Sequence, residues 1–274
     1  MRDYEKLKAL LAEMGGVVIG YSGGVDSTLV AKAATDALGE RAVSVLVESC
    51  LVPASELEEA VTTAEELGLN LVRIKADPLA ADRVAQNDPN RCYHCKNAVF
   101  LMIREVADQR GLSYVLDGAN VDDESDYRPG AKAVEELGVR SPLKELGFDK
   151  EQIRAISRDI GLPTWNKPSY ACLASRVPYG TRLTEETLKQ IESAESVLRA
   201  LGLRQFRVRH HGDTARIEVM PLDMEKVITA AVREHIVREL RALGYRYVSL
   251  DLAGYRTGSL NEALSFGAKD SPEA

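Results

Sequence analysis

The sequence predicts an α/β protein with a parallel, doubly wound sheet, followed by a smaller α+β domain. Short apolar runs alternate with amphipathic helical patterns over the first 165 residues, which is typical of a parallel sheet covered on both faces. After residues 166–183, which have no clear period, the order changes to helix, strand, strand, helix, strand. We therefore expect domains at 1–165 and 184–268, a connecting active-site loop at 166–183 and a disordered tail at 269–274.

The first domain divides into helices and strands by its hydrophobic period. Ser55 and Glu58 predict a capping box for one helix, which Gly68 ends, and Gly111 ends the next helix. A polar stretch at 77–91 predicts a loop that leads into the cysteines at 92 and 95. We expect helices over residues 5–13, 28–34, 55–67, 96–110 and 149–160, and strands over 17–19, 42–49, 69–75 and 113–116.

The second domain begins with Thr184, a good N-cap residue, and its first helix ends before Gly202. Alternation of apolar and polar residues then predicts short strands, and a long amphipathic pattern predicts one further helix. We expect helices over 184–201 and 221–243, and strands over 204–210, 215–219 and 245–252.

The composition is that of an ordinary globular protein. The chain has 274 residues, of which 45% are hydrophobic and 28% charged, with a net charge of −7. The alternating charges at the start do not form a signal peptide, and no apolar run approaches the length of a membrane span. We expect a cytoplasmic protein without a membrane partner, and the acidic balance argues against a nucleic-acid partner.

A glycine-rich turn follows the apolar run Val17–Ile19 and precedes a helical pattern. It reads Ser22-Gly23-Gly24-Val25-Asp26-Ser27. Glycines let the backbone turn sharply, the following helix offers unpaired amides to an anion, and the two serines add hydroxyl donors. Asp26 would repel a bare phosphate, so we expect it to hold a cation or orient the helix. These features predict a pyrophosphate cradle that differs from the Walker loop, which ends in Gly-Lys-Ser/Thr.

Other segments are expected at the same edge of the sheet, where ligands of such folds bind. They are Glu48–Cys50 and Asp117–Asn120, which includes Gly118. Acidic residues around Asn120 suit Mg²⁺, which prefers carboxylate oxygens, although a solvated acidic turn would look the same. The acidic candidates are Asp117, Asp122, Asp123, Glu124 and Asp126. We expect Asp123 and Asp126, together with Asp26 of the glycine-rich turn, to be the Mg²⁺ ligands. Arg128 could contact a phosphate or these carboxylates.

Three cysteines have a pattern that suits chemistry. Cys92 and Cys95 form a CxxC, and Cys172 lies in the 166–183 loop. Four interpretations remain open: a [4Fe–4S] cluster with one iron left for another ligand, direct thiol or persulfide chemistry, a zinc site completed by His94, or no metal. Cys50, at the end of a strand, is expected to be a buried structural thiol.

Two arginines, Arg207 and Arg209, lie two residues apart and share a strand face. With Ser175 and Arg176 they could bind a substrate phosphate, for which the guanidinium fork is well shaped. A polar sheet face exposed to water would have the same pattern. The adjacent pair His210–His211 points to opposite sides of the strand and carries a weaker signal.

The loop at residues 22–27 resembles the PP-loop of ATP pyrophosphatases, enzymes of the adenine nucleotide alpha hydrolase-like type that split ATP into AMP and pyrophosphate. Further motifs, spread over nearly the whole chain, resemble the LarE family, sulfur transferases of nickel-pincer nucleotide cofactor synthesis. These motifs lie at residues 115–130, 165–168, 172–180, 206–209 and 251–258.

The resemblance implies that MgATP adenylates a carboxylate of pyridinium-3,5-biscarboxylic acid mononucleotide, which then becomes a thiocarboxylate. One branch of the family sacrifices its own cysteine sulfur in a single turnover, and another holds a [4Fe–4S] cluster on three cysteines. Cys92, Cys95 and Cys172 match the second branch. The resemblance also implies a substrate-phosphate site at Ser175, Arg207 and Arg209, with Glu195 nearby, and a homohexamer built as a trimer of dimers.

Three other functions compete with this one. An ammonia-dependent synthetase resembling NAD or GMP synthetase needs the PP-loop but has no use for the three cysteines. A tRNA-thiolating PP-loop enzyme needs a basic surface, which the net charge of −7 disfavours. A catalytically silent nucleotide-binding or scaffolding protein would not need an intact PP-loop together with the thiols.

Overall fold

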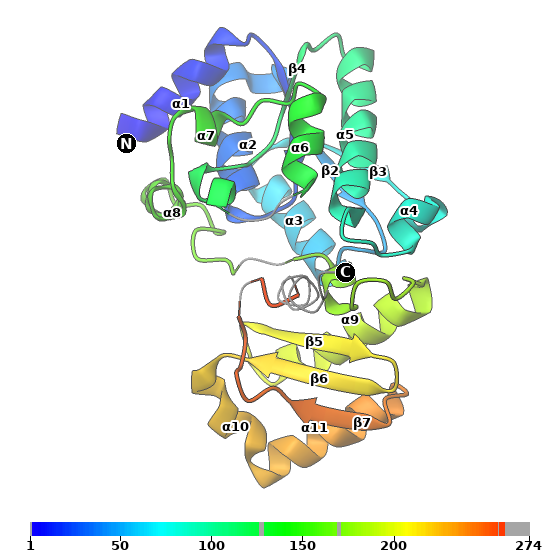
Figure 1. Cartoon of the computed structure of the whole chain (residues 1–274). Coiled ribbons are helices and arrows are strands. Elements are labelled where there is room, and N and C mark those ends of the chain that lie inside the picture. The colour runs from blue at the N-terminus through cyan, green and yellow to red at the C-terminus, as the bar shows by residue number, and fades with distance from the viewer. Residues whose placement is uncertain (1, 126–128, 169–170, 257, 261–274) are drawn as a thin grey trace, which may run out of the picture. The chain divides into compact units, whose positions relative to one another are not determined.

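The computed structural model describes residues 2–125, 129–168, 171–256 and 258–260 (Figure 1). The chain forms two compact units, which are considered separately below. Unit 1 comprises residues 1–84 and 88–170, and unit 2 comprises residues 85–87 and 171–274. The part of the chain that is described contains no helix long and apolar enough to span a membrane. The tail expected at 269–274 lies outside the described residues.

Unit 1 contains a parallel sheet with the order β3-β2-β1-β4. The central strand β1 pairs with β2 through Val18 and Val43, and with β4 through Val18 and Val115. All pairs are parallel, so the carboxyl ends of the strands share one edge. The strands are β1 (Val17–Tyr21), β2 (Ala42–Glu48), β3 (Asn70–Lys75) and β4 (Tyr114–Leu116).

Helices cover both faces of this sheet, which confirms the doubly wound α/β prediction. Val17 and Ile19 share a core with α1, α2 and α8 on one face, and Val18 packs with α5 on the other. The helices up to residue 160 are α1 (Arg2–Glu13), α2 (Val25–Leu38), α3 (Ala54–Glu66), α4 (Asp82–Ala85), α5 (Arg91–Gln109), α6 (Pro129–Glu136), α7 (Pro142–Glu145) and α8 (Lys150–Asp159).

Unit 2 is a three-stranded sheet of order β5-β6-β7 with helices around it. Strands β5 and β6 are antiparallel, and β6 and β7 are parallel. Phe206, Val208 and Ile217 contribute to a core shared with α9 and α11. The elements are η4 (Leu173–Arg176), α9 (Glu185–Ala200), β5 (Phe206–His211), β6 (Thr214–Val219), η5 (Pro221–Asp223), α10 (Met224–Ile228), α11 (Ala230–Ala242) and β7 (Tyr247–Leu250).

The single helix expected over 221–243 is wrong. Thr229 has an extended ψ of 144°, which interrupts the helical hydrogen bonds and separates α10 from α11. Its hydroxyl donates a hydrogen bond to the carbonyl of Lys226 at 2.9 Å, which satisfies an acceptor at the end of α10. The amphipathic period continues across the break, so hydrophobicity alone did not reveal it.

Two expected helix starts also differ. The capping box of Ser55 and Glu58 is absent because α3 begins earlier, with Pro53 as N-cap and no side-chain cap. Helix α5 begins at Arg91, so Cys92 lies in its first turn and not in a preceding loop. In both cases a helix-compatible residue upstream extends the helix beyond the strongest periodic signal.

Candidate functional site

The PP-loop, residues 22–27, connects β1 to α2 at the carboxyl edge of the parallel sheet. Ser27 closes the loop: its hydroxyl accepts a hydrogen bond from the Ser22 amide at 3.1 Å and lies 3.0 Å from the Ser22 hydroxyl. Gly24 is the N-cap of α2 and has no side chain to occupy the helix start. A helix start without a side-chain cap can offer its first-turn amides to an anion, so the pyrophosphate cradle stays a prediction for this loop.

Two glycines of this site allow close backbone approaches. Gly23 has φ +69°, and a Cβ atom there would lie 2.5 Å from the Cβ of Ala60 on α3. Gly118 follows β4, and a Cβ atom there would lie 2.9 Å from the amide nitrogen of Ser27. The segment after β4 therefore passes directly over the start of α2, and only glycine fits between the two backbones.

Asp26, in the first turn of α2, has two partners from distant parts of unit 1. The Lys150 ammonium forms an ion pair with one of its carboxylate oxygens. The Asn120 side chain donates a hydrogen bond to the other at 3.3 Å. Mg²⁺ bound with nucleotide usually takes one or two protein carboxylates together with phosphate oxygens, and Asp26 suits that pattern.

The acidic segment after β4 is largely engaged with its own backbone. Asp117 is buried and accepts hydrogen bonds from the Ala119 amide at 3.1 Å and the Ser141 hydroxyl at 2.7 Å. Asp123 accepts one from the Asn120 amide at 3.1 Å. Among the described residues, no group of three or more His, Cys, Asp or Glu side chains is arranged to hold a metal ion. Asp126 and Arg128 lie outside the described residues.

The cysteines lie in two different surroundings. Cys92 and Cys95 are one turn apart on α5 in unit 1, and the Arg91 guanidinium lies 3.6 Å from the Cys92 sulfur. Cys172 is the N-cap of η4 in unit 2. None of these three thiols forms a disulfide, and all three are partly exposed. Cys50 is also partly exposed, so the expectation that it is buried is wrong: it lies in the turn after β2 and not within the strand.

The segment that carries Cys172 is anchored within unit 2. Asn87, which has φ +56°, donates hydrogen bonds to the carbonyls of Val177 at 3.2 Å and Pro178 at 2.8 Å. Its own carbonyl accepts one from the Gly180 amide at 3.0 Å. Residues that lie far upstream in the sequence thus fix the loop directly after Cys172.

Arg176 is fully buried behind Cys172. Its guanidinium forms a two-point ion pair with Glu195 of α9, with both N–O distances 2.9 Å. The remaining nitrogen donates to the Cys172 carbonyl and the Ser175 hydroxyl, each at 3.0 Å. Glu195 also accepts a hydrogen bond from the Val208 amide of β5 at 3.1 Å. The structure therefore brings together the Cys172 segment, α9 and β5 around one buried charge pair.

Arg207 and Arg209 of β5 lie beside this pair. Arg209 forms a second two-point ion pair, with Glu218 of β6 at 3.0 and 2.8 Å, and donates to the Ser175 carbonyl at 2.7 Å. Arg207 lies over the ring of Tyr255, with 5.0 Å between guanidinium carbon and ring centroid. Burial, and then repulsion from Arg176, lower the pKa of Arg207. Three guanidinium groups thus lie in a buried cluster with the two carboxylates of Glu195 and Glu218. Guanidinium groups are well shaped to bind an anion such as phosphate.

Several residues of these two sites were missed by sequence reasoning. Lys150 could have been found, because a cation in the first turn of a helix opposes the helix dipole and indicates a nearby anion. Glu218 could have been found from its alternation with Arg216 on a strand opposite the two arginines. Tyr255 lies in the family-like motif at 251–258, but that motif does not indicate its contact with Arg207. Asn87 carries no signal in the sequence, because its contacts depend on tertiary packing.

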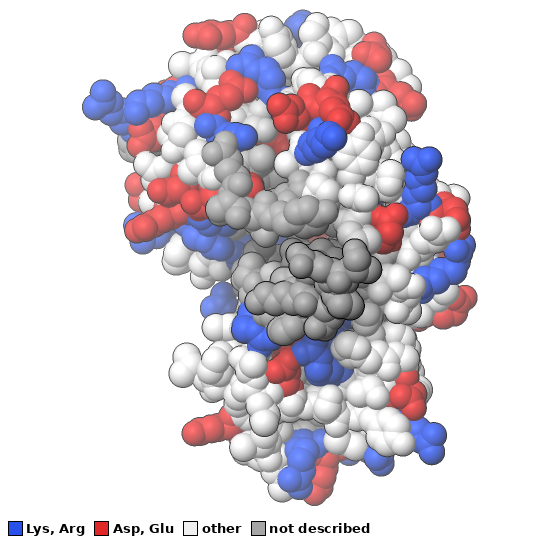
Figure 2. All heavy atoms as spheres, viewed as in Figure 1, with Lys and Arg blue, Asp and Glu red and all other residues white. Residues whose placement is uncertain are grey.

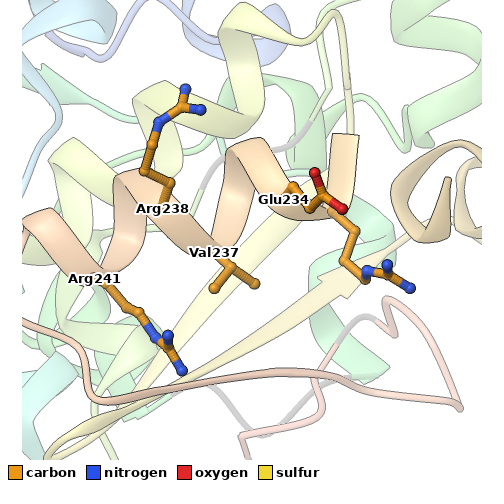
Figure 3. A pocket seen from close by; sticks show the side chains of 5 residues that line it. Glu234, Val237, Arg238 and Arg241 are labelled. Carbon is orange, nitrogen blue, oxygen red and sulfur yellow. The ribbon is translucent and has the colours of Figure 1, made fainter. Parts of the chain in front are cut away.

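A shallow hollow on α11 contains none of the predicted residues. All of its lining side chains come from this one helix, and they point outward on both sides of a valine (Figure 3). They are Arg233, Glu234, Val237, Arg238 and Arg241. A hollow on one face of a single helix encloses no ligand, so the candidate sites are the PP-loop and the arginine cluster.

Comparison with known proteins supports an enzyme built on this PP-loop unit. The NAD synthase family model matches residues 5–104. The pyridinium-3,5-bisthiocarboxylic acid mononucleotide synthase of Lactiplantibacillus plantarum is 40% identical over 260 residues, which cover 94% of each chain. The chain belongs to this synthase family, LarE. It is therefore an ATP-dependent enzyme of the PP-loop type.

Other relatives match this chain over different shares of its length. An uncharacterised protein of Synechocystis is 41% identical, over 95% of this chain and 97% of its own length. A glutamine-hydrolysing GMP synthase of Aeropyrum pernix is 29% identical, but the match covers 71% of this chain and only 42% of that protein. The likeness to the LarE family thus includes both units.

Proposed function

We propose that this protein uses ATP to convert a carboxylate of pyridinium-3,5-biscarboxylic acid mononucleotide into a thiocarboxylate. The observation that carries the proposal is a PP-loop closed by Ser22 and Ser27 in a chain related over 94% of its length to a synthase named for the bisthiocarboxylic product. The substrate, the adenylation step and the sulfur source are all part of the proposal.

In the first step, a substrate carboxylate oxygen attacks the α-phosphorus of ATP, and pyrophosphate leaves. The PP-loop amides and Ser27 bind the phosphates, and Asp26 holds Mg²⁺. In the second step, a sulfur nucleophile attacks the acyl carbon, and AMP leaves with the activated oxygen. Adenylation is needed because a carboxylate is a poor electrophile until it carries a good leaving group.

The sulfur is proposed to come through a [4Fe–4S] cluster held by Cys92, Cys95 and Cys172. Two observations support the proposal: the first two thiols are one helical turn apart on α5, and all three thiols are partly exposed and outside any disulfide. Cysteine thiolates are the usual ligands of such a cluster. When bound, the cluster would supply sulfide for the transfer. The alternatives are a sacrificial Cys172 that gives up its own sulfur, and zinc held with His94.

The substrate phosphate is proposed to bind at Ser175, Arg207 and Arg209. Arg209 is held by Glu218, and the guanidinium of Arg207 lies over the ring of Tyr255, so both side chains have defined orientations. The planar fork of a guanidinium group is well shaped to bind phosphate. Glu195 and Glu218 keep the neighbouring guanidinium groups in fixed orientations.

The first experiment measures pyrophosphate release from ATP in three separate reactions. The substrates are the pyridinium mononucleotide, tRNA, and ammonia together with a nucleotide substrate of an ammonia-dependent synthetase. Release with the pyridinium compound alone, and a product mass for oxygen replaced by sulfur, is the expected result. Release with ammonia would favour the synthetase activity suggested by the GMP synthase likeness. Release with tRNA is not expected, because the net charge of −7 disfavours a nucleic-acid substrate. On the face shown in Figure 2, positive and negative side chains are interspersed.

The second experiment measures iron and acid-labile sulfide after anaerobic purification. Cys92→Ala, Cys95→Ala and Cys172→Ala should each lose iron, whereas the matched control Cys50→Ala should retain about four irons per chain. Absence of iron from the reconstituted wild type would overturn the cluster. A mass loss of about 34 Da after turnover, one hydrogen sulfide, would instead identify a sacrificial cysteine.

A further inference from the structure

Lys150 lies where a nucleotide-bound cation is expected. Its ammonium forms an ion pair with Asp26, the one carboxylate of the PP-loop. The two side chains are 33% and 22% exposed, so solvent ions can reach the pair. An inference from this contact rests on the proposed use of ATP.

The backbone of Lys150 is fixed independently of its side chain. Its amide donates a hydrogen bond to Asp122 at 2.8 Å. The side chain of the preceding residue, Asp149, caps α8 by accepting a hydrogen bond from the Gln152 amide at 2.7 Å. The Asp149 amide in turn donates to the side-chain oxygen of Gln152 at 3.1 Å. A change of the Lys150 side chain therefore leaves the start of α8 in place and removes only the ammonium.

The Asp26 carboxylate presents a conflict at this site. It lies in the first turn of α2, where the amides of the helix start attract an anion such as triphosphate. An uncompensated carboxylate there would repel that anion, and it would also attract a divalent cation. Lys150 removes the repulsion of the triphosphate by neutralising Asp26. It also weakens the binding of a divalent cation, because its ammonium already occupies the carboxylate.

We propose that Lys150 is an internal counter-ion of the PP-loop, which holds Asp26 until Mg²⁺ arrives with the nucleotide and replaces it. Binding of MgATP is then an exchange of cations on Asp26. Lys150 is therefore a positioning residue. In the empty loop it neutralises the charge of Asp26, which would otherwise repel phosphate, and it competes with Mg²⁺ for the Asp26 carboxylate when no nucleotide is bound.

The test uses Lys150→Met and two binding measurements that need neither the pyridinium substrate nor sulfur. The first is Mn²⁺ binding without nucleotide, followed by electron paramagnetic resonance. The second is binding of α,β-methylene-ATP in the presence of a chelator. The variant should bind Mn²⁺ about tenfold more tightly and the metal-free nucleotide about tenfold more weakly. Opposite signs are expected because the same missing charge favours a cation and repels an anion.

Two variants serve as controls. Asp26→Asn leaves the ammonium uncompensated, so it should reverse both signs. Lys132→Met removes a 74% exposed lysine that pairs with Glu136 on α6, so it should change neither affinity. Equal affinities in Lys150→Met and wild type, or changes of the same sign, would overturn the inference. Failure of wild type to bind the nucleotide with Mg²⁺ present would instead overturn the proposed function itself.

Discussion

At the scale of single residues, the second unit depends on charges buried in pairs. Arg176 with Glu195, and Arg209 with Glu218, both have two-point geometry and very little exposed surface. Removal of one partner leaves an uncompensated buried charge, which is far more costly than loss of an exposed pair. Arg176 also donates to the Cys172 carbonyl, so its charge pair positions the segment that holds this cysteine.

Arg176→Met should lower the free energy of unfolding by about 3–5 kcal/mol, because Glu195 would remain charged and buried. It should also change the alkylation rate of Cys172, since the carbonyl contact at this residue is lost. Urea unfolding and mass spectrometry after iodoacetamide treatment measure the two effects.

The matched control for Arg176→Met is the double variant with Glu195→Gln. The glutamine oxygen can still accept the Val208 hydrogen bond but carries no charge, so part of the lost stability should return. A cost below about 1 kcal/mol for the single variant would contradict a buried-charge role for this pair.

His210 should make stability depend on pH. Burial and then the neighbouring His211 lower the pKa of His210 below its ordinary value of 6.5. The unfolded chain then binds the proton more readily, so stability is complete above pH 6.5 and falls as the pH decreases below it. Urea unfolding at about pH 7.5 and about pH 5.5 should show this loss, and His210→Gln should reduce its size. An unchanged difference in the variant would assign the loss to other groups.

At the scale of elements, the PP-loop works because a strand, a glycine turn and a helix meet a second loop at close range. Gly118 belongs to that second loop, after β4, and faces the amide of Ser27. The sequence indicates that Gly118 lies at the same sheet edge, but the need for glycine there comes from the distance between two backbones.

Gly118→Ala should weaken binding of α,β-methylene-ATP with Mg²⁺ by about tenfold or more, because the new Cβ would displace the start of α2. Gly111→Ala is a suitable control: this glycine has φ +62°, and a Cβ atom there would meet no other described atom within 4 Å. The control should cost about 1 kcal/mol of stability through backbone strain and leave the affinity unchanged. Equal affinity in wild type and Gly118→Ala would show that the close approach does not shape the site.

Helix α5 shows how one element changes the interpretation of a motif. A CxxC in a loop has no fixed geometry, but Cys92 and Cys95 in the first turns of α5 lie three residues apart on one helix face. The helix also places Arg91 beside the Cys92 sulfur. Both thiols are therefore presented in a defined orientation by the helix.

At the scale of the whole molecule, the resemblance to the LarE family predicts a homohexamer. Native mass spectrometry should give about six times the chain mass of 30.0 kDa, or about 180 kDa. Dissociation at low protein concentration should pass through a dimer, since a trimer of dimers is expected. A mass of 30.0 kDa at micromolar concentration would contradict this prediction.

The sequence by itself determined the α/β fold of unit 1, the place of the PP-loop and the family. These features depend on local information: Val17–Ile19 is an apolar run, and the glycines and serines of residues 22–27 follow it directly. The hydrophobic period located most helices for the same reason, and it failed at Thr229, where a backbone angle changes without a change in period.

Only the tertiary structure decided which charges meet. Lys150 pairs with Asp26 across 124 positions, and Asn87 holds the carbonyl of Pro178 across 91. Arg209 is held by Glu218 because two antiparallel strands place them together. Such contacts arise when the chain packs, and their strength depends on burial, which lowers the local dielectric. The residue types were visible in the sequence, but their partners were fixed by the fold.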